Sequence, residues 1–365
     1  MNGLSFLRGT WIIAALELRQ RRRSRTLWIF AIVWFVIIGL VSGVTWFSMT
    51  SLTQDSVGGP GTAPLFSIIV YFVLFFGSLV APAISAGSIG AERAGGTLAT
   101  TQTTLVGTWS ILLGKALAAW VTGLAFLVIA LPFIALSLAF GAVAPSQAII
   151  AVLALALQLG LFTAIGVGLS ACISSQLFAI VTTYLVVALL SVGTIIAFSL
   201  ALASTTDEVR LTDRVLTDEY FKLTEDCADD ACYEKVPRTC EDSPSMYTVT
   251  HNERFWWILS MNPYVVLGDM VADRVPASEQ RDLFDYVSES ARSMQIPQED
   301  PTPYNGCAAE SDHYPAWDED DLSGTSPAWW VGLSLQGIIA GVALGCGYFR
   351  LRTPARTLPQ GTRVA

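Results

Sequence analysis

Long apolar runs alternate with short polar segments over most of the chain. Six runs of about 20 residues contain no Asp, Glu, Lys or Arg: Thr26–Phe47, Pro64–Ser85, Ala116–Leu138, Gln147–Cys172, Phe178–Ala203 and Pro327–Phe349. A helix of about 20 residues crosses the roughly 30 Å hydrocarbon core of a bilayer. The runs are continuously apolar, and a backbone in lipid must satisfy its own hydrogen bonds. The pattern predicts an all-α polytopic membrane protein with six transmembrane helices.

Charge is scarce and unevenly placed, and it sets the expected orientation. Charged residues make up 14% of the chain, against roughly 25% in soluble proteins. Residues 1–25, 91–115 and 350–365 together hold 12 basic and 2 acidic residues, whereas 204–326 holds 9 basic and 27 acidic residues. Because basic segments stay on the cytoplasmic side, both termini are expected in the cytoplasm. The 18 Arg against 3 Lys suggest a high-GC bacterium, and hence its plasma membrane.

These two patterns divide the chain into five segments. They are a cytoplasmic or interfacial N-terminal helix (1–25), five spans (26–203) with a cytoplasmic loop (87–115), an acidic extracellular domain (204–326), the sixth span (327–349) and a basic tail (350–365). Leu4–Leu18 has an apolar side with Trp11, which favours a helix lying on the inner leaflet. A plain cytoplasmic tail is the alternative. No cleavage site closely follows the first apolar run, so a signal peptide is not expected.

The extracellular segment is expected to be rich in helix. Helices are predicted over Thr212–Thr224 and Gln280–Met294, with an irregular strap over Gln295–Ser326. The apolar segment 254–271 is too short to span and is interrupted by Pro263, so it fits a re-entrant pair of helices in the outer leaflet. A buried helix of the extracellular domain is the alternative.

Six cysteines follow the same division. Cys172 and Cys346 lie in spans, where a thiol is ordinary apolar filler. The other four lie in the acidic segment: Cys227, Cys232, Cys240 and Cys307. In an oxidising compartment they suggest two disulfides, with three connectivities open. A metal site is disfavoured, since neither a Cys-x-x-Cys pair nor a histidine at ligand spacing occurs.

The polar residues of the spans could serve either transport or packing. Hydroxyl groups that could line a pathway for an amphipathic molecule are Ser67, Tyr71, Ser78, Thr182, Thr183, Tyr184, Ser191 and Thr194. Ordinary hydrogen bonding between helices is the commoner role of such groups. Gly337, Gly341 and Gly345 form a small-residue ridge that indicates close helix packing, within the chain or across a dimer.

Several chemistries are disfavoured by the sequence. Gly107 to Lys115 has the wrong spacing for a phosphate loop, and Ala116 stands where Ser or Thr is needed. Any ATP and Mg²⁺ would therefore be bound by another chain, and this chain needs no cofactor of its own. The spans carry no ionisable group of the kind that proton-coupled transporters bury. Neither a catalytic constellation nor a nucleic-acid-binding pattern is recognisable, so an enzyme is not expected.

The polar stretch Ala91–Lys115 resembles the cytoplasmic loop between the second and third spans of ABC-2 type transporter permeases. The resemblance rests on Glu92-Arg93, then Gly95-Gly96-Thr97-Leu98, and on Gly114-Lys115. It is supported by Glu17 and Arg19 before the first span and by Asn262-Pro263 with Leu267 and Asp269 before the last. The long acidic, cysteine-bearing insert departs from compact members of the family.

This resemblance implies a mechanism and partners. Two permease subunits, the same or related, would pair in the lipid bilayer, each resting on a cytoplasmic ABC ATPase subunit. The resemblance also implies which residues would pass the movement of the ATPase to the spans. These coupling residues are Glu17, Arg19, Glu92, Arg93, Gly95, Gly96, Thr97 and Leu98. The implied activity is export of a hydrophobic or amphipathic drug, lipid or peptide. A membrane scaffold or sensor, whose extracellular domain binds a ligand, is the alternative.

Overall fold

Two compact units make up the chain. The computed structural model describes residues 5–52, 63–95, 107–140, 144–225, 227, 232, 236–272, 282–298, 301–307, 322 and 324–352. The first unit comprises Met1–Ile195, Trp257–Ala291 and Pro327–Ala365, and the second comprises Ile196–Trp256 and Arg292–Ser326. The expected extracellular domain 204–326 is therefore shared between the two, because its residues 257–291 group with the first unit.

Helices dominate the described chain. Up to residue 204 they are α1 (Phe6–Arg22), α2 (Arg25–Leu52), α3 (Ala63–Ser85), α4 (Ser88–Ala94), α6 (Thr108–Phe140), α7 (Pro145–Cys172), α8 (Gln176–Ala188), η2 (Leu189–Gly193) and α9 (Thr194–Ser204). From residue 252 on they are η3 (Asn252–Arg254), α12 (Trp256–Ser260), α13 (Pro263–Val271), α14 (Leu283–Ser293) and α15 (Ala328–Leu351). The predicted helix near 280–294 is thus confirmed as α14.

All six predicted spans are confirmed as long apolar helices. The helical stretches long and apolar enough to cross a membrane are Arg25–Ser48, Leu65–Arg93, Thr108–Leu138, Pro145–Cys172, Gln176–Ser204 and Ala328–Leu351. A helix pairs most of its backbone groups within itself, as a spanning segment must. Several of these stretches are longer than predicted, because helix continues past the apolar run into polar residues, as at the start of α6, which includes Lys115.

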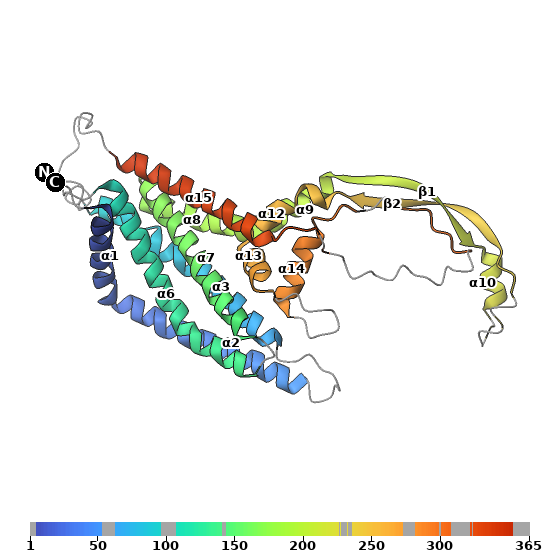
Figure 1. The fold of residues 1–365 in the computed structure, drawn as a ribbon, viewed down its shortest axis with the longest axis horizontal. Coiled ribbons are helices and arrows are strands. Elements are labelled where there is room, and N and C mark those ends of the chain that lie inside the picture. The colour runs from blue at the N-terminus through green and yellow to red at the C-terminus, as the bar shows by residue number, and fades with distance from the viewer. Residues whose placement is uncertain are drawn as a thin grey trace. The chain divides into compact units, whose positions relative to one another are not determined.

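In the first unit, α7 lies at the centre and α3, α6 and α15 pack against it (Figure 1). Gly168 of α7 lets α15 approach closely, since a Cβ there would lie 2.5 Å from the backbone carbon of Ala343 in α15. Aromatic side chains fill the core, with Trp34 stacked on Phe76 at a centroid distance of 3.9 Å. By contrast, much of α2 and α8 exposes Leu, Ile, Val and Phe, as expected for faces turned to lipid.

A broken helix pair packs against the spans where the re-entrant segment was predicted. The pair is α12 and α13, separated at Asn262-Pro263. The Asn262 amide is 1% exposed and donates to Ser191 O at 2.5 Å and to Thr194 Oγ1 at 3.0 Å. Its partner Ser191 lies in η2, a single π-helical turn that interrupts the fifth span. Inserted side chains are a known cause of such irregular turns.

Asp269 joins this helix pair to its neighbours. Its Oδ2 accepts from the backbone N–H of Trp329 at 2.9 Å, and its Oδ1 accepts from the Ser288 hydroxyl at 2.7 Å. The carboxylate therefore sits at the N-terminus of α15, where a helix favours negative charge. One buried side chain of α13 thereby connects α14 and α15.

The second unit corrects the expectation of an α-rich insert. Its main element is an antiparallel pair of 11-residue strands, β1 (Thr206–Leu216) and β2 (Cys240–Thr250), with the short helix α10 (Asp218–Thr224) between them. The helix predicted over Thr212–Thr224 was wrong in its first half. Residues 206–216 alternate in exposure, as strands do, and their partner strand is distant in sequence.

Disulfides fix one of the three open connectivities. Cys227 pairs with Cys232, and Cys240 pairs with Cys307. Cys172 and Cys346, expected as separate thiols, are also paired, with a Cα–Cα distance of 5.5 Å. That expectation was wrong because α7 and α15, far apart in sequence, run side by side in the fold.

Candidate functional site

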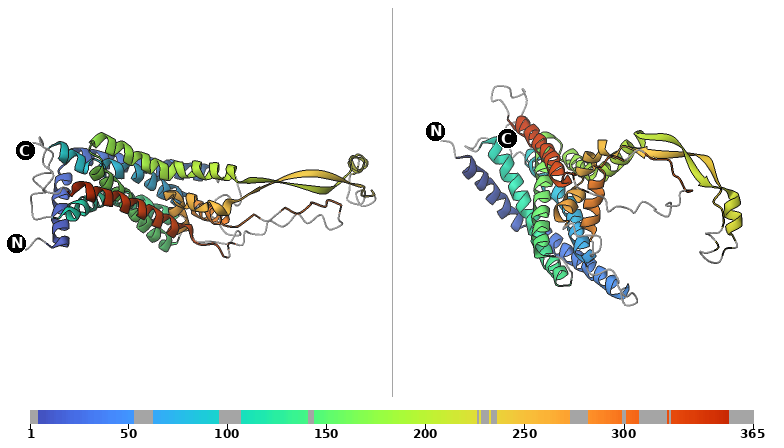
Figure 2. Two further views of the ribbon diagram at one scale, coloured as in Figure 1. Left: turned by 90° about the horizontal axis from the view of Figure 1, so that it is seen from above. Right: turned by 45° about the vertical axis from the view of Figure 1, so that its right-hand side comes forward.

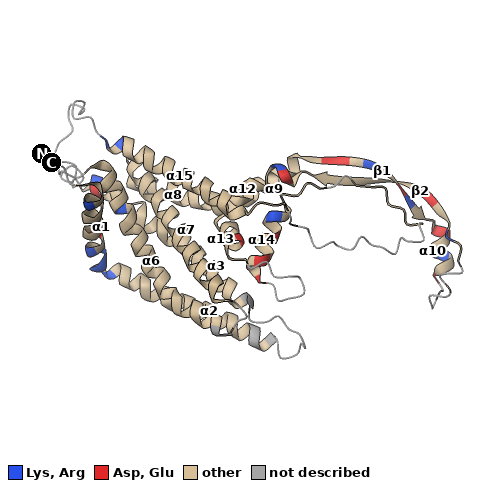
Figure 3. Cartoon of the chain, in the orientation of Figure 1, with Lys and Arg blue, Asp and Glu red and all other residues tan. Residues whose placement is uncertain are grey.

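Basic side chains gather at one end of the helical unit. Figure 3 shows them on α1 and at the end of α15, while the acidic residues of α13 and α14 lie toward the other end of this unit. At the basic end the Ser110 hydroxyl donates to Phe6 O at 3.2 Å, and Trp109 stacks on Tyr348 at 4.7 Å. The starts of α1 and α6 and the end of α15 therefore meet there (Figure 2).

Lys115 is the charged centre of this end. Its side chain is only 2% exposed, and its Nζ donates to Glu92 Oε1 at 2.6 Å and to the carboxylate of Glu17. Glu17 lies on α1, Glu92 on α4 and Lys115 on α6. Charged hydrogen bonds are stronger than neutral ones, so one ammonium group joins three helices. We call this the Lys115 network.

The neighbouring glycine explains how α1 comes so close. A Cβ on Gly114 would lie 2.8 Å from Ile13 Cβ and 2.9 Å from the carbonyl oxygen of Thr10. Ala14, on the same helix face, is fully buried. The small residue therefore lets α1 lie directly on α6, and Glu17, one turn further along α1, reaches Lys115.

Two arginines bind backbone carbonyl groups near the Lys115 network. Arg21 lies 3.6 Å from Glu17 and donates to Ile84 O at 3.0 Å and to Thr122 Oγ1 at 3.4 Å. Burial lowers the pKa of the Arg21 guanidinium from its ordinary value, and the charge of Glu17 partly opposes that change. The guanidinium is therefore a partly desolvated cation at the corner between α1 and α2.

Arg93 caps the end of α7. It donates to Ala171 O at 3.2 Å and to Ile173 O at 3.1 Å. A cation at a helix C-terminus satisfies carbonyl groups that have no partner within the helix. Because Arg93 follows Glu92 on α4, this short helix is held to both α6 and α7.

The predicted coupling residues thus divide into three groups. Glu17 and Glu92 are brought together by Lys115, and Arg93 binds α7. Arg19 is exposed on α1, and Gly95 is exposed where α4 ends. Gly96, Thr97 and Leu98 lie outside the described residues.

Sequence reasoning singled out Lys115 only as the end of a loop motif. A usable signal was present, because Lys115 is the one charged residue in α6. A lone lysine inside an otherwise apolar helix needs an acidic partner when buried. Which acids would reach it could not be predicted, since Glu17 and Glu92 are 98 and 23 residues away.

Half of the hydroxyl groups proposed to line a pathway bond within their own span. Ser78, Thr183, Ser191 and Thr194 each donate to a carbonyl three or four residues earlier. Tyr184 bridges helices, donating to Leu79 O at 2.9 Å. Tyr71 packs on Phe284 at a centroid distance of 4.9 Å, Ser67 is buried and Thr182 is half-buried. These contacts do not gather the set around one cavity.

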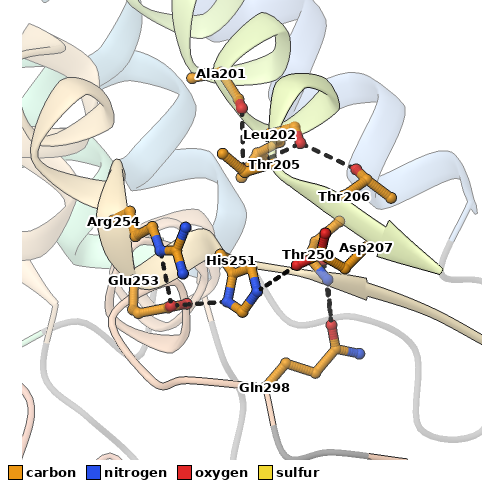
Figure 4. Close-up of polar contacts among 10 residues, drawn as sticks. All are labelled: Ala201, Leu202, Thr205, Thr206, Asp207, Thr250, His251, Glu253, Arg254 and Gln298. Carbon is orange, nitrogen blue, oxygen red and sulfur yellow. Dashed lines mark hydrogen bonds and ion pairs between the residues drawn. The ribbon is translucent and has the colours of Figure 1, made fainter. Parts of the chain in front are cut away.

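A histidine cluster lies in the second unit, near the base of its hairpin (Figure 4). Nε2 of His251 is 3.2 Å from Asp207 Oδ2, and its Nδ1 is 3.1 Å from Glu253 Oε1. The two ring nitrogens point in opposite directions, so the two carboxylates cannot share one metal ion with this ring. Over the part of the chain that the structure describes, no His, Cys, Asp and Glu group has metal-binding geometry.

Six helices long and apolar enough to cross a membrane define a polytopic membrane protein. The family model described as ABC-2 family transporter protein matches residues 11–226. The chain belongs to this family. No match was found among curated proteins. The matched region runs from α1 into α10 and contains the whole Lys115 network.

Proposed function

We propose that this chain is the membrane permease subunit of an ATP-driven exporter that works with a separate cytoplasmic ATPase subunit. ABC-2 permeases are membrane subunits that act with ATPase partners, which supports the assignment. The cargo we propose is hydrophobic or amphipathic, a drug, lipid or peptide, moved outward. Two permease subunits, the same or related, would form the transporter in a bacterial plasma membrane with both termini in the cytoplasm.

The Lys115 network is the observation that carries this proposal. ATPase closure would push on α4, which is only seven residues long and could not transmit force alone. Through Lys115 and Arg93, however, α4 is bound to α1, α6 and α7. A push on this group would therefore move the third and fourth spans together with the N-terminal helix, instead of bending a loop.

Charge supports the proposed orientation. The basic end of the helical unit holds α1 and the end of α15 (Figure 3), and α4 is joined to α1 there through Lys115. Basic residues close to span ends are retained in the cytoplasm. On this side a soluble ATPase would meet exposed Gly95 directly.

The test uses the full-length permease purified with the ATPase subunit encoded beside it. A photo-crosslinking residue at Gly95 should capture the ATPase, and the same residue at Gly43, exposed within α2, should not. Glu92→Gln should leave the complex intact and lower transport per ATP hydrolysed, because an uncharged amide holds Lys115 less firmly. Glu219→Gln, on exposed α10, is the matched control.

Two outcomes would count against the proposal. If no ATPase co-purifies and the crosslinking residue at position 95 captures no protein, the chain is not driven by such a partner. The hypothesis of a membrane scaffold or sensor would then be favoured. If Glu92→Gln and Glu219→Gln behave alike within an intact complex, force does not pass through the Lys115 network.

A further inference from the structure

A cavity of about 450 Å³ lies in the corner where α1 turns into α2, beside α6. We call it the corner cavity. Its charged wall is formed by Arg21 and Arg22, and its apolar wall by residues that include Trp28, Phe126 and Ile129. The two helices diverge after Arg23 while both pack on α6, and so they leave this space between them.

The cavity is charged at one end and apolar along its length. From Thr122 to Ile129, both of which line it, α6 rises about 10 Å. Residues 17–25 at the charged end contain five arginines and one glutamate. The Trp28 indole donates to Arg22 O at 3.2 Å and is 61% exposed, so it stands at the mouth. Tryptophan is typical of the boundary between headgroups and hydrocarbon.

Arg21 has binding capacity left at this position. Its contacts with Glu17, Thr122 and Ile84 use one N–H on each of its three nitrogens. A guanidinium carries five N–H groups, so among the described residues two N–H groups have no partner. Arg22 beside it is exposed. Two guanidinium groups in this arrangement suit a phosphate oxygen pair.

The floor of the cavity is rigid and apolar. Phe126, which lines it, has its carbonyl oxygen bound by the Trp34 indole at 3.0 Å, and Trp34 is 1% exposed. This contact fixes α2 against α6 beneath the space. A preformed apolar cavity favours a flexible acyl chain over water, because water there would find few polar partners.

We propose that the corner cavity binds one anionic phospholipid from the leaflet at the basic end, with its phosphate at Arg21 and Arg22. One acyl chain lies along α6 toward Ile129. The bound lipid fills the corner between α1 and α2, and thereby holds the angle at which α1 crosses α6. Lipid binding at this site needs no ATPase partner.

Lipid binding can be measured on the detergent-solubilised full-length protein by titrating dioleoylphosphatidylglycerol and counting adducts by native mass spectrometry. Arg22→Gln should weaken the tightest adduct about fivefold, as expected for loss of one basic contact with an anionic headgroup. Arg19→Gln removes the same charge from the same helix, but Arg19 does not line the cavity. It should leave the adduct unchanged. Ala125→Trp, at an exposed lining position, should abolish the adduct by filling the slot.

The controls distinguish the alternatives. Equal weakening by Arg19→Gln and Arg22→Gln would mean diffuse attraction to anionic lipid and would overturn the proposal. Equal binding of glycerophosphoglycerol, which lacks the acyl chains, would also overturn it. Phosphatidylcholine should bind more weakly than phosphatidylglycerol. If Ala125→Trp lowers the unfolding temperature, the two arginine variants still decide the outcome.

Discussion

Lys115 is the residue that joins the helices at the basic end of the first unit. It is buried between two carboxylates that come from different helices. Buried ion pairs add little net stability compared with an apolar replacement, but removing one partner is strongly destabilising. The residue therefore commits Glu17 and Glu92 to one arrangement.

Lys115→Met should lower the free energy of unfolding by about 3 kcal/mol, because the ammonium group between the Glu17 and Glu92 carboxylates is lost and Arg21 remains beside Glu17 only. Thermal unfolding of the detergent-solubilised protein measures the change. Adding Glu92→Gln to Lys115→Met should recover part of the loss by removing one of the two charges. If the double variant is less stable than Lys115→Met alone, repulsion between the carboxylates is not the cause.

Asp282 should make the stability of α14 depend on pH. Its Oδ1 accepts from the backbone N–H groups of Phe284 and Asp285, at 2.7 and 3.1 Å. Burial raises the pKa of Asp282 from 3.8 to about 6. The folded state therefore binds this proton more tightly than the unfolded state, and the stabilisation is present below about pH 4 and is lost as pH rises through 6.

Unfolding temperatures of the purified protein at pH 4.5 and pH 7 measure this dependence. Asp282→Asn should flatten the difference, because the amide still accepts the two backbone hydrogen bonds and cannot titrate. Asp218→Asn, at the exposed start of α10, provides the control. If Asp282→Asn leaves the difference between the two unfolding temperatures unchanged, the pH dependence comes from other groups.

At the scale of elements, α7 packs tightly against α15. Gly168 meets the α15 backbone, whereas no atom of the described residues lies within 4 Å of a Cβ built on Gly337, Gly341 or Gly345. The ridge that the sequence suggested for close packing therefore does not face any of the described helices. Its opposite side, with Gly332, Gln336 and Ala340, is buried instead.

Gly168→Ala should destabilise the protein by about 1–3 kcal/mol, because the added methyl group would press on the α15 backbone. Gly337→Ala is the matched control. In the isolated chain it should be neutral or stabilising by up to about 1 kcal/mol, since alanine favours helix. Thermal unfolding in detergent compares the two. A loss in Gly337→Ala as large as that in Gly168→Ala would show that the contact of Gly168 with the α15 backbone is not the cause.

At the scale of the whole molecule, the charge division of the chain should set its orientation. Alkaline phosphatase, which is active only outside the cytoplasm, can be fused after Asp218 or after Gly95. The fusion at Asp218 should be active and the fusion at Gly95 inactive, because basic segments are retained inside. The reverse pattern of activity would place the Lys115 network outside and would remove it from contact with a cytoplasmic ATPase.

The sequence by itself determined the six spans, the amphipathic N-terminal helix, α14 and the family motif. These features depend on local composition and on periods within one helix, which a single sequence displays. The broken pair at Asn262-Pro263 belongs here too, since a proline interrupts an apolar run that is too short to span.

Only the tertiary structure decided what joins distant segments. Lys115 meets Glu17 across 98 residues, Cys172 pairs with Cys346 across 174, and β1 takes its partner from beyond α10. The prediction of a helix over Thr212–Thr224 failed in its first half because strand formation depends on a partner strand more than on intrinsic preference. Contacts between helices depend on which faces meet, and that choice is made by the packing of the whole bundle.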